Sequence, residues 1–483
     1  MKIITKKVKD KLIRTQQIKI KKGHKLFNYF DELCFKSKNL YNVSNYYFRQ
    51  VLTGLQKDKP TKNEKEIIDI INSNIPIVNK IKIDNVKKQR LKKPETPDAK
   101  LYEPLDKENK YLNYELLDAI FKITKQVDYY SLPSHSNQGI MKLLFQDWDS
   151  YFEAIKDYKV NPFKYKGKPK IPSYAKKTGR KVAFFTNQTC TIKDNKYLRF
   201  PKTKHKLNIG KLGNIDGKLK QVRVVPYNNY FEVELIFELK EKLPSLKTKE
   251  PKNILGIDLG IDNFATISNN IDQPPMIVKG KVLKSINQFY NKERAHYYSI
   301  LRQGKGPKEG SFISNKLNKL DSKRHSKVKD FLHKASFNII NYAEKHNIDT
   351  IVIGKNEGFK DNIKLRKTTK LTFTTIPYSL FIELITYKAE AKGIRIILQE
   401  ESYTSKSSFL DNDDIPIFGE VKIKPKFSGK RIKRGLYKSA SGEVINADIN
   451  GSLNIIRKAI PNAFNNKLWN RGMVFQPLVL IVN

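Results

Sequence analysis

The order of strands and helices expected in the C-terminal half constrains the fold of this chain most strongly. From residue 254, ILGIDLGIDNFATIS predicts two strands joined by a glycine turn, and PPMIVKG predicts a third. Two long basic helices, at about 284–303 and 313–346, are then expected before the apolar strand DTIVIG. The series continues with a helix in IPYSLFIELITYKAEAKG, a strand in IRIILQEE and a helix in INADINGSLNIIRKAI. The spacing of apolar residues supports each assignment.

Three strands in a meander, followed by two strands that are each preceded by a helix, is the order of the ribonuclease H fold. We therefore predict a domain of this fold in the C-terminal half. Phosphodiester hydrolysis on this fold requires carboxylates that hold two Mg²⁺ ions about 4 Å apart. Acidic residues at strand ends that the fold brings together are thus the candidate ligands.

Two aspartates are the first candidates. Asp258 lies within the apolar strand GIDLGID, where an ionised carboxylate is costly without a metal or a partner. A buried ion pair with a lysine is the alternative interpretation. Asp448 begins the apolar helix in NADINGSLNII, where a helix-capping role is the alternative. Because the predicted fold pairs the two aspartates, we favour metal binding for both.

A third acid is expected at the end of the fourth strand, but Gly354 occupies that position. In the ribonuclease H order the fifth strand lies beside the fourth, and it ends in Glu400 and Glu401. Adjacent like charges favour a nearby cation. We predict Glu401 as the third ligand, with Glu400 and then Glu357 as alternates. Solvated charges at a strand end are the simpler interpretation.

The composition indicates a partner for the whole chain. Its 483 residues include 93 Lys and Arg against 48 Asp and Glu, a net charge of +45, while 39% are hydrophobic. A folded protein with this charge is typical of nucleic-acid binding. Two distant cysteines, Cys34 and Cys190, cannot form a disulfide framework or a four-cysteine zinc site. We expect no signal peptide, no membrane span and a cytoplasmic location.

The N-terminal half predicts helices followed by short strands. A strand at 12–23 precedes a long amphipathic helix at 24–55, and a second helical zone spans 113–158. Residues 56–112 are rich in lysine and contain an expected exposed loop. After a basic, extended segment that begins at 159, short runs rich in β-branched and aromatic residues predict a small barrel or sandwich.

Several of these segments together resemble the TnpB family of transposon-encoded, RNA-guided DNA nucleases, which are related to type V CRISPR effectors and to Fanzor proteins. They are GIDLGIDNFATIS, the break after IVI, YKAEAKG, EESYTSKSS and NADINGSLNII, with SLPSHSNQGIMKLLFQDWDSYFEAIKD and KYKGKPKIPSY upstream. The resemblance covers most of the chain. It implies a multidomain α+β protein with a helical recognition lobe, a β-barrel wedge domain and a RuvC-like nuclease domain.

The resemblance also implies domain bounds. Residues 1–35 would hold the first wedge strand and the start of the recognition helix, 36–158 the recognition lobe and 159–250 the wedge domain. The nuclease domain would span 251–483.

Two features depart from the usual TnpB pattern. The family usually has a glutamate where this chain has Gly354, but some members and Fanzor relatives carry a relocated glutamate, which EESYTSK resembles. This version favours Glu401 and implies that Gly354 makes room for it. The family also usually carries two CxxC pairs before the last aspartate, and this chain has Ser408, Asp411, Lys438 and Ser441 near those positions. We therefore predict no zinc and a zinc-free insert at about 403–445.

Basic segments are expected to contact a nucleic-acid backbone, which gives affinity without reading sequence. The insert holds eight Lys and Arg and no acid over 421–438, and a solvated surface is the alternative there. The predicted backbone contacts are Lys164, Lys166, Lys168, Lys170, Lys430, Arg431, Lys433 and Arg434. In the family, the first lobe and the wedge read a short DNA motif. We predict such contacts for Tyr41, Asn42, Asn137 and Gln138, with capping or core packing as alternatives.

The resemblance implies an RNA-guided DNA endonuclease with two Mg²⁺ ions at a single RuvC site. Its partners would be a guide RNA and double-stranded target DNA with a short adjacent motif, and one protein would act per RNA in the nucleoid. A nuclease-inactive, RNA-guided DNA-binding repressor is the alternative, because Gly354 replaces an expected acid. A guide-independent nuclease or transposase is a third hypothesis. The roughly 250 residues before the catalytic domain are more than such an enzyme would need.

Overall fold

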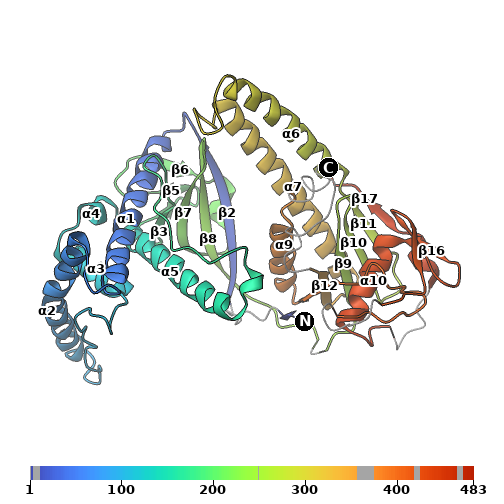
Figure 1. The fold of residues 1–483 in the computed structure, drawn as a ribbon, viewed down its shortest axis with the longest axis horizontal. Coiled ribbons are helices and arrows are strands. Elements are labelled where there is room, and N and C mark those ends of the chain that lie inside the picture. The colour runs from blue at the N-terminus through green and yellow to red at the C-terminus, as the bar shows by residue number, and fades with distance from the viewer. Residues whose placement is uncertain are drawn as a thin grey trace. The chain divides into compact units, whose positions relative to one another are not determined.

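The chain divides into two compact units, which are described separately (Figure 1). The structure is a computed structural model that describes residues 2–3, 11–248, 250–355, 375–417, 425–464 and 471–482. One unit comprises Ile13–Lys240, and the other joins Met1–Leu12 to Glu241–Asn483. Helices, sheets and a buried core occur in both units. This confirms the multidomain α+β class.

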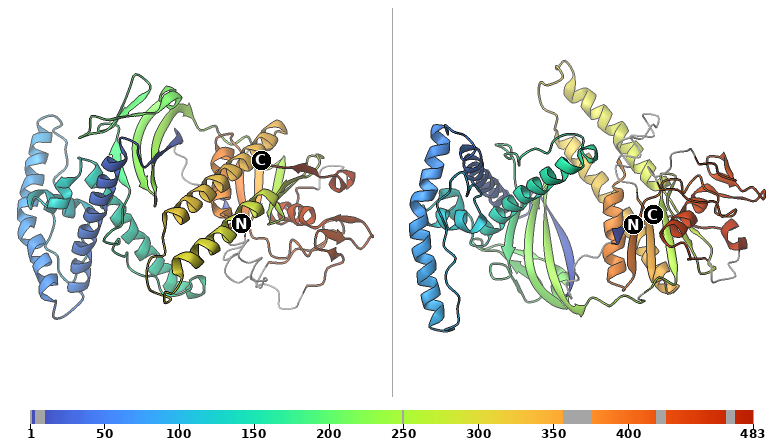
Figure 2. Two further views of the ribbon diagram at one scale, coloured as in Figure 1. Left: turned by 90° about the horizontal axis from the view of Figure 1, so that it is seen from above. Right: turned by 60° about the horizontal axis from the view of Figure 1, so that its bottom comes forward.

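The Ile13–Lys240 unit contains a helical part. Its helices are α1 (Phe27–Gly54), α2 (Lys62–Arg90), α3 (Tyr114–Ile123), α4 (Val127–Ser131) and α5 (Ser136–Val160). Helix α1 packs against α2, α4 and α5, and Figure 2 shows α1 and α2 side by side. Aromatic residues stabilise this packing: Trp148 of α5 stacks on Phe48 of α1, with ring centroids 4.3 Å apart.

Helix α2 was not expected from the sequence. Its lysines and the internal Pro76 obscure an apolar pattern in which Ile67, Ile71, Ile75 and Val78 recur at helical spacing and are buried. A capping box starts the helix, because the Thr61 side chain accepts from the Glu64 backbone and the Glu64 carboxylate accepts from the Thr61 backbone.

The same unit contains two sheets. The first has the order β2 (Lys11–Lys21), β8 (Tyr230–Lys242), β7 (Gly217–Pro226), β3 (Ala183–Thr186). The second joins β4 (Thr191–Lys193), β5 (Tyr197–Arg199) and β6 (Lys206–Asn208). The pairs β3–β7, β7–β8, β4–β5 and β5–β6 are antiparallel. Two short 3₁₀ helices are also present: η1 (Pro162–Lys164) follows α5, and η2 (Gly210–Asn214) lies between β6 and β7. Both cysteines are buried in the shared core.

The other unit is built on one sheet. Its central order is β11 (Met276–Lys279), β10 (Asn263–Asn269), β9 (Ile254–Leu259), β12 (Thr350–Gly354), β13 (Arg395–Gln399). Strands β9, β10 and β11 form an antiparallel meander, whereas β12 runs parallel to both β9 and β13. Strands β1 (Lys2–Ile3) and β17 (Leu478–Leu480) extend the two edges. The ribonuclease H order predicted from the sequence is confirmed.

Helices cover both faces of this sheet (Figure 1). One face packs against α6 (Lys281–Arg302), α7 (Asn315–Lys345) and α9 (Tyr378–Glu390) in the largest core of the unit. The other face packs against α10 (Ala447–Ala459), where Ile455 and Ile456 meet Ile254, Val352 and Ile397.

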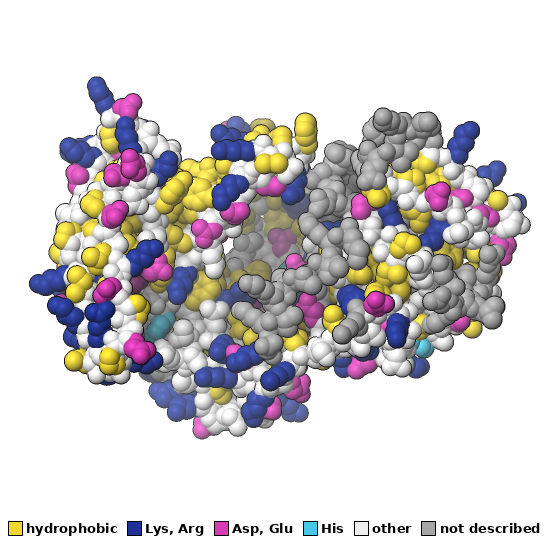
Figure 3. Space-filling model, turned by 90° about the horizontal axis from the view of Figure 1, so that it is seen from below, with side chains coloured by type: hydrophobic (Ala, Val, Ile, Leu, Met, Phe, Trp, Pro, Cys, Tyr) yellow, Lys and Arg dark blue, Asp and Glu magenta, His cyan; other side chains and the backbone are white. Residues whose placement is uncertain are grey.

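The expected zinc-free insert contains a three-stranded antiparallel sheet. It comprises β14 (Lys430–Lys433), β15 (Leu436–Lys438) and β16 (Val444–Asn446), and η3 (Arg471–Phe475) follows α10 in the chain. Figure 3 shows Lys and Arg side chains spread over the visible face, with acidic side chains among them. Across the described ranges, no helix is both long and apolar enough to span a bilayer.

Candidate active site

Strand alternation determines which side chains meet at the candidate active site. Successive strand residues point to opposite faces of a sheet. In β9, Leu255 and Ile257 belong to the core under α7 and α9, so Gly256 and Asp258 face α10. Parallel pairing places Gly354 beside Gln399 and Ile353 beside Ile257. The α10 face therefore carries Asp258 and the end of β12 next to each other.

Asp258 lies against the first turns of α10. A Cβ atom added to Gly451 would be 2.8 Å from Asp258 Oδ2, so a glycine is required for this close approach. Burial of the carboxyl group and the negative charge of Asp448 raise the pKa of Asp258 to about 7, although Arg431 opposes the shift. In the described part of the chain, no lysine forms an ion pair with Asp258, which argues against the lysine-paired alternative.

Glu401 occupies the space that Gly354 leaves. A Cβ atom on Gly354 would lie 2.5 Å from Glu401 Oε2 and 2.6 Å from Ile455. Burial and the charges of Asp258 and Glu400 raise the pKa of Glu401 to about 8, against the opposing charge of Lys458. Burial raises the pKa of Tyr378, and the charges of Asp258 and Glu401 raise it further. Glu401 thus lies close enough to Asp258 for the charge of Asp258 to affect its pKa.

Glu400 has a different environment from Glu401. Its Oε2 atom is 2.6 Å from Lys458 Nζ, and its Oε1 atom accepts from the Ser402 backbone at 2.6 Å. Burial opposes ionisation, but hydrogen bonds from Lys458 and Ser402 outweigh it and lower the pKa of Glu400. Lys458 also donates to the carbonyls of Ser402 and Pro416. Glu400 therefore anchors the turn after β13, while Glu401 points to the glycine.

Asp448 is positioned by its neighbours. The helix cap is Asn446, whose side chain accepts from the Asp448 and Ile449 backbones, so the capping role considered for Asp448 is wrong. Asp448 Oδ2 accepts from Asn263 Nδ2 at 2.7 Å, and Arg431 lies 3.4 Å from Oδ1. Lys279 Nζ donates to Asn263 Oδ1 at 2.9 Å. Both carboxylate oxygens of Asp448 thus have partners on the protein, and its negative charge raises the pKa of Asp258.

The donor chemistry of these residues fits a hard divalent cation. Asp258, Glu401 and Asp448 supply carboxylate oxygens, which Mg²⁺ prefers. Burial and mutual repulsion raise the pKa of Asp258 and Glu401, and a cation bound between them would relieve the repulsion. Among the described residues, no group of three or more His, Cys, Asp or Glu side chains is arranged as a complete metal site.

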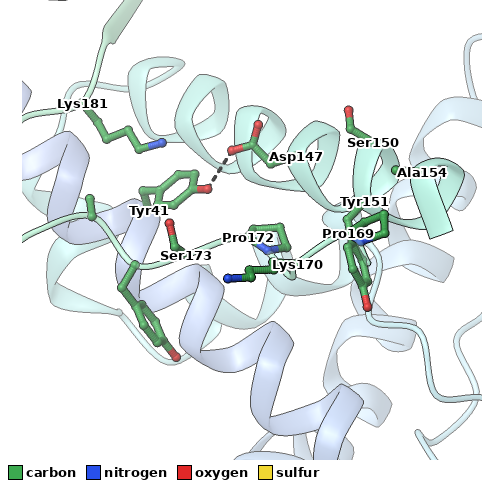
Figure 4. A pocket seen from close by; sticks show the side chains of 12 residues that line it. Tyr41, Asp147, Ser150, Tyr151, Ala154, Pro169, Lys170, Pro172, Ser173 and Lys181 are labelled. Carbon is green, nitrogen blue, oxygen red and sulfur yellow. Dashed lines mark hydrogen bonds between the residues drawn. The ribbon is translucent and has the colours of Figure 1, made fainter. Parts of the chain in front are cut away.

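The predicted base contacts Tyr41 and Asn42 already have protein partners. Tyr41 is buried and donates to Asp147 at 2.7 Å, with Lys181 Nζ 3.7 Å from its ring centroid. These side chains line a cleft of 410 Å³ between α1, α5 and the segment 169–175 (Figure 4). Asn42 bonds both backbone groups of Ala175, at 2.9 and 2.8 Å. A base contact by Asn42 would cost these two bonds.

The second pair of predicted base contacts lies at the start of α5. Asn137 is buried and donates to the Tyr129 carbonyl, while its side-chain oxygen accepts from the Gln138 backbone. Gln138 is half-buried. For both pairs, base reading stays a prediction.

The predicted backbone contacts lie on exposed surface. Lys164, Lys166, Lys168 and Lys170 are all exposed, and Lys164 is paired with Asp157 at 2.9 Å. Lys430, Arg431 and Lys433 lie on β14, and Arg434 pairs with Asp262 at 2.9 Å. The alternate ligand Glu357 lies outside the described residues.

Sequence reasoning missed three supporting residues: Asn263, Lys279 and Lys458. Asn263 lies 185 positions from Asp448, and Lys458 lies 58 positions from Glu400. Asn263 follows Asp258 in the motif GIDLGIDNF, and this proximity in sequence was the available signal for its role. Strand alternation was also available for Glu401, because it shares the parity of Ile397 and Gln399, and Ile397 packs against α10.

Comparisons with known proteins find two family models and one curated protein that match parts of this chain. Residues 232–359 match the OrfB_IS605 family, described as a probable transposase, and residues 378–455 match the Cas12f1-like TNB domain. The CRISPR-associated endodeoxyribonuclease Cas12f1 of Sulfoacidibacillus thermotolerans is 27% identical over 241 residues, which cover 48% of this chain and 50% of that protein. The chain therefore spans about half the length of this curated relative.

Two solved structures match this chain at low identity and low TM-score. A cryo-EM structure of a Cas12f1–sgRNA–target DNA complex covers 92% of this chain and 99% of that one, at 13% identity and a TM-score of 0.43. A CRISPR–Cas12f ternary complex covers 84% of each chain, at 14% identity and a TM-score of 0.32.

Proposed function

Because this chain is a TnpB-like protein, we propose that it is an RNA-guided DNA endonuclease with a single metal-dependent RuvC site. Asp258, Glu401 and Asp448 would hold Mg²⁺. The observation that carries the proposal is the Glu401 carboxylate in the space beside Gly354, because it restores a third acid next to Asp258. The named relative, an endodeoxyribonuclease, supports the same reaction class.

The residues of this chain have distinct roles in the proposed reaction. When bound, Mg²⁺ supplies positive charge that stabilises the attacking and leaving oxygens of the phosphodiester. Asp258 and Glu401 would hold the ion in their deprotonated forms, and Asn263 keeps one oxygen of Asp448 in a fixed direction. Lys458 neutralises Glu400, so that Glu401 is the acid directed to the site.

The proposed partners are a guide RNA and a double-stranded DNA target. The net charge of +45 and the exposed lysines at 164–170 suit binding to two polyanions at once. Base pairing with the guide would supply target sequence, and the first lobe would read a short adjacent motif. We propose one protein per RNA, acting in the cytoplasm at the nucleoid.

The test is cleavage of a plasmid library by the full chain, purified with its co-expressed RNA, in the presence and absence of Mg²⁺. Asp258→Asn and Glu401→Gln should each slow cutting by at least about a hundredfold, because a lost ligand forfeits several kcal/mol of charge stabilisation. Glu390→Gln, on an exposed site of α9, is the matched control and should cut normally.

Other outcomes distinguish the competing hypotheses. Loss of cutting with Glu357→Gln and normal cutting with Glu401→Gln would contradict the proposed site. RNA-dependent binding without cutting would support the repressor, and cutting without RNA would support a guide-independent nuclease.

A further inference from the structure

A phenylalanine is presented to solvent just beyond the end of α5. Phe163 lies in η1, and its side chain is fully exposed. A large aromatic side chain usually buries roughly 150–250 Å² of surface on folding. The protein core gains nothing from Phe163, so its apolar surface is available to a partner.

Hydrogen bonds from residues before and after Phe163 stabilise the turn that carries it. Asp157, in the last turns of α5, accepts from Asn161 at 3.0 Å, from Lys164 Nζ at 2.9 Å and from Tyr165 Oη at 2.7 Å. Tyr165 also packs edge-on against Tyr158, with ring centroids 5.7 Å apart. These contacts flank Phe163 in the chain and fix the backbone that presents its ring.

The surroundings of the ring are positively charged. Lys159, Lys164, Lys166 and Lys168 are exposed within five residues of Phe163. The acid in this stretch, Asp157, is engaged in bracing the turn. Such cations attract phosphates rather than lipid tails or apolar peptides. A flat apolar ring among them suits the face of a nucleobase.

We propose that Phe163 is a stacking platform for an unpaired base of bound nucleic acid, whose backbone contacts the flanking lysines. The proposal rests on the proposed function only in requiring that the chain bind nucleic acid; cutting is not needed. A base stacked on an aromatic side chain contributes about 5- to 150-fold in affinity. The rigid turn adds to this gain because little conformational freedom is lost on binding.

The test is the affinity of the full chain for fluorescein-labelled single-stranded 20-mers, with separate RNA and DNA arms, measured by anisotropy at three salt concentrations. Phe163→Leu keeps an apolar side chain but removes the π-face. It should weaken binding in at least one arm by about 5-fold or more, by a similar factor at every salt concentration. Lys166→Met should show a loss that shrinks as salt rises, because its contact is electrostatic.

Two further variants sharpen the result. Phe163→Trp should restore affinity, and its indole fluorescence should be quenched when the oligonucleotide binds. Phe337→Leu, at an exposed phenylalanine on α7, is the matched control and should bind like the unaltered chain.

Three results would overturn the proposal. They are affinity of Phe163→Leu within twofold of the unaltered chain in both arms, a loss that vanishes at high salt, and an equal loss in Phe337→Leu. A chain that binds with this pattern but never cuts DNA would refute the proposed endonuclease and leave the stacking site standing.

Discussion

At the scale of single residues, Asn263 shows how chemistry fixes a side chain. The Lys279 ammonium can only donate, so the amide oxygen of Asn263 must face it. The amide nitrogen then faces Asp448 Oδ2. This relay crosses from β11 through β10 to α10, and it sets the direction of one proposed metal ligand. Replacing a residue that orients a metal ligand typically lowers metal affinity by about 10- to 100-fold.

We predict that Asn263→Leu lowers the affinity of the full chain for Mn²⁺, used as a probe for Mg²⁺, by about 10- to 100-fold. Lys279→Met should also lower this affinity, because the side-chain amide of Asn263 could then rotate and exchange its oxygen and nitrogen. The measurement is isothermal titration calorimetry without nucleic acid.

The double variant separates a relay from a simple charge effect. If Lys279 acts through Asn263, adding Lys279→Met to Asn263→Leu costs nothing more. Lys284→Met is the control, because Lys284 pairs with Asp262. Additive losses in the double variant would show that Lys279 acts by charge alone.

At the scale of elements, the zinc-free insert is held by a carboxylate. Asp411 Oδ2 accepts from Ser408 Oγ at 2.5 Å, from Ser428 Oγ at 3.2 Å and from the Ala440 backbone at 2.8 Å. It thereby joins the turn after β13 to the segments before β14 and after β15. Burial opposes ionisation of Asp411, but these hydrogen bonds outweigh it and lower its pKa. Ser408 and Asp411, near the positions where TnpB proteins usually carry a CxxC pair, are thus linked by a hydrogen bond.

We predict that Asp411→Ala destabilises the insert by about 1–3 kcal/mol, because several donors lose their acceptor. Limited proteolysis should detect faster cleavage within 403–445. Dialysis against EDTA should leave the unaltered chain equally resistant. Because its folded-state pKa is lowered, Asp411 should stabilise the insert above its ordinary pKa of 3.8 and lose this effect as pH falls below it. Asp414→Ala is the control, and equal resistance of Asp411→Ala would contradict the prediction.

At the scale of the whole molecule, the candidate chemistry lies in one unit. Asp258, Glu401 and Asp448 all lie within Glu241–Asn483, whereas the exposed lysines at 164–170 and Phe163 lie within Ile13–Lys240. Each unit has its own core, so each is expected to unfold as its own cooperative transition. A ligand stabilises only the unit whose folded form binds it.

We predict two unfolding transitions in calorimetry of the RNA-free chain. Mg²⁺ should raise the midpoint temperature of one of them. At a concentration of about 100 times Kd, the stabilisation should be about 2.7 kcal/mol. Asp258→Asn should abolish the shift, and Asp272→Asn, outside the candidate site, should keep it. Equal shifts of both transitions would contradict binding at the proposed carboxylates.

Local sequence predicted much of the fold because the periodicity of apolar residues is a local property. It predicted the ribonuclease H strand order, the long helix α1, and Asp258 as an acid in an apolar strand. It failed at α2, where lysines and a proline obscured a helical pattern of isoleucines. It also left Glu400 and Glu401 as alternatives.

Sequence by itself therefore determined the order of elements and the acids available to a metal site. Tertiary structure decided which acid faces the glycine, because β13 turns Glu401 toward α10 and Lys458 retains Glu400. It also decided that Asn42 and Asn137 bond the protein's own backbone, and that Asn263 supports Asp448. These outcomes depend on partners far apart in the chain, and only the folded path of the backbone brings them within hydrogen-bonding distance.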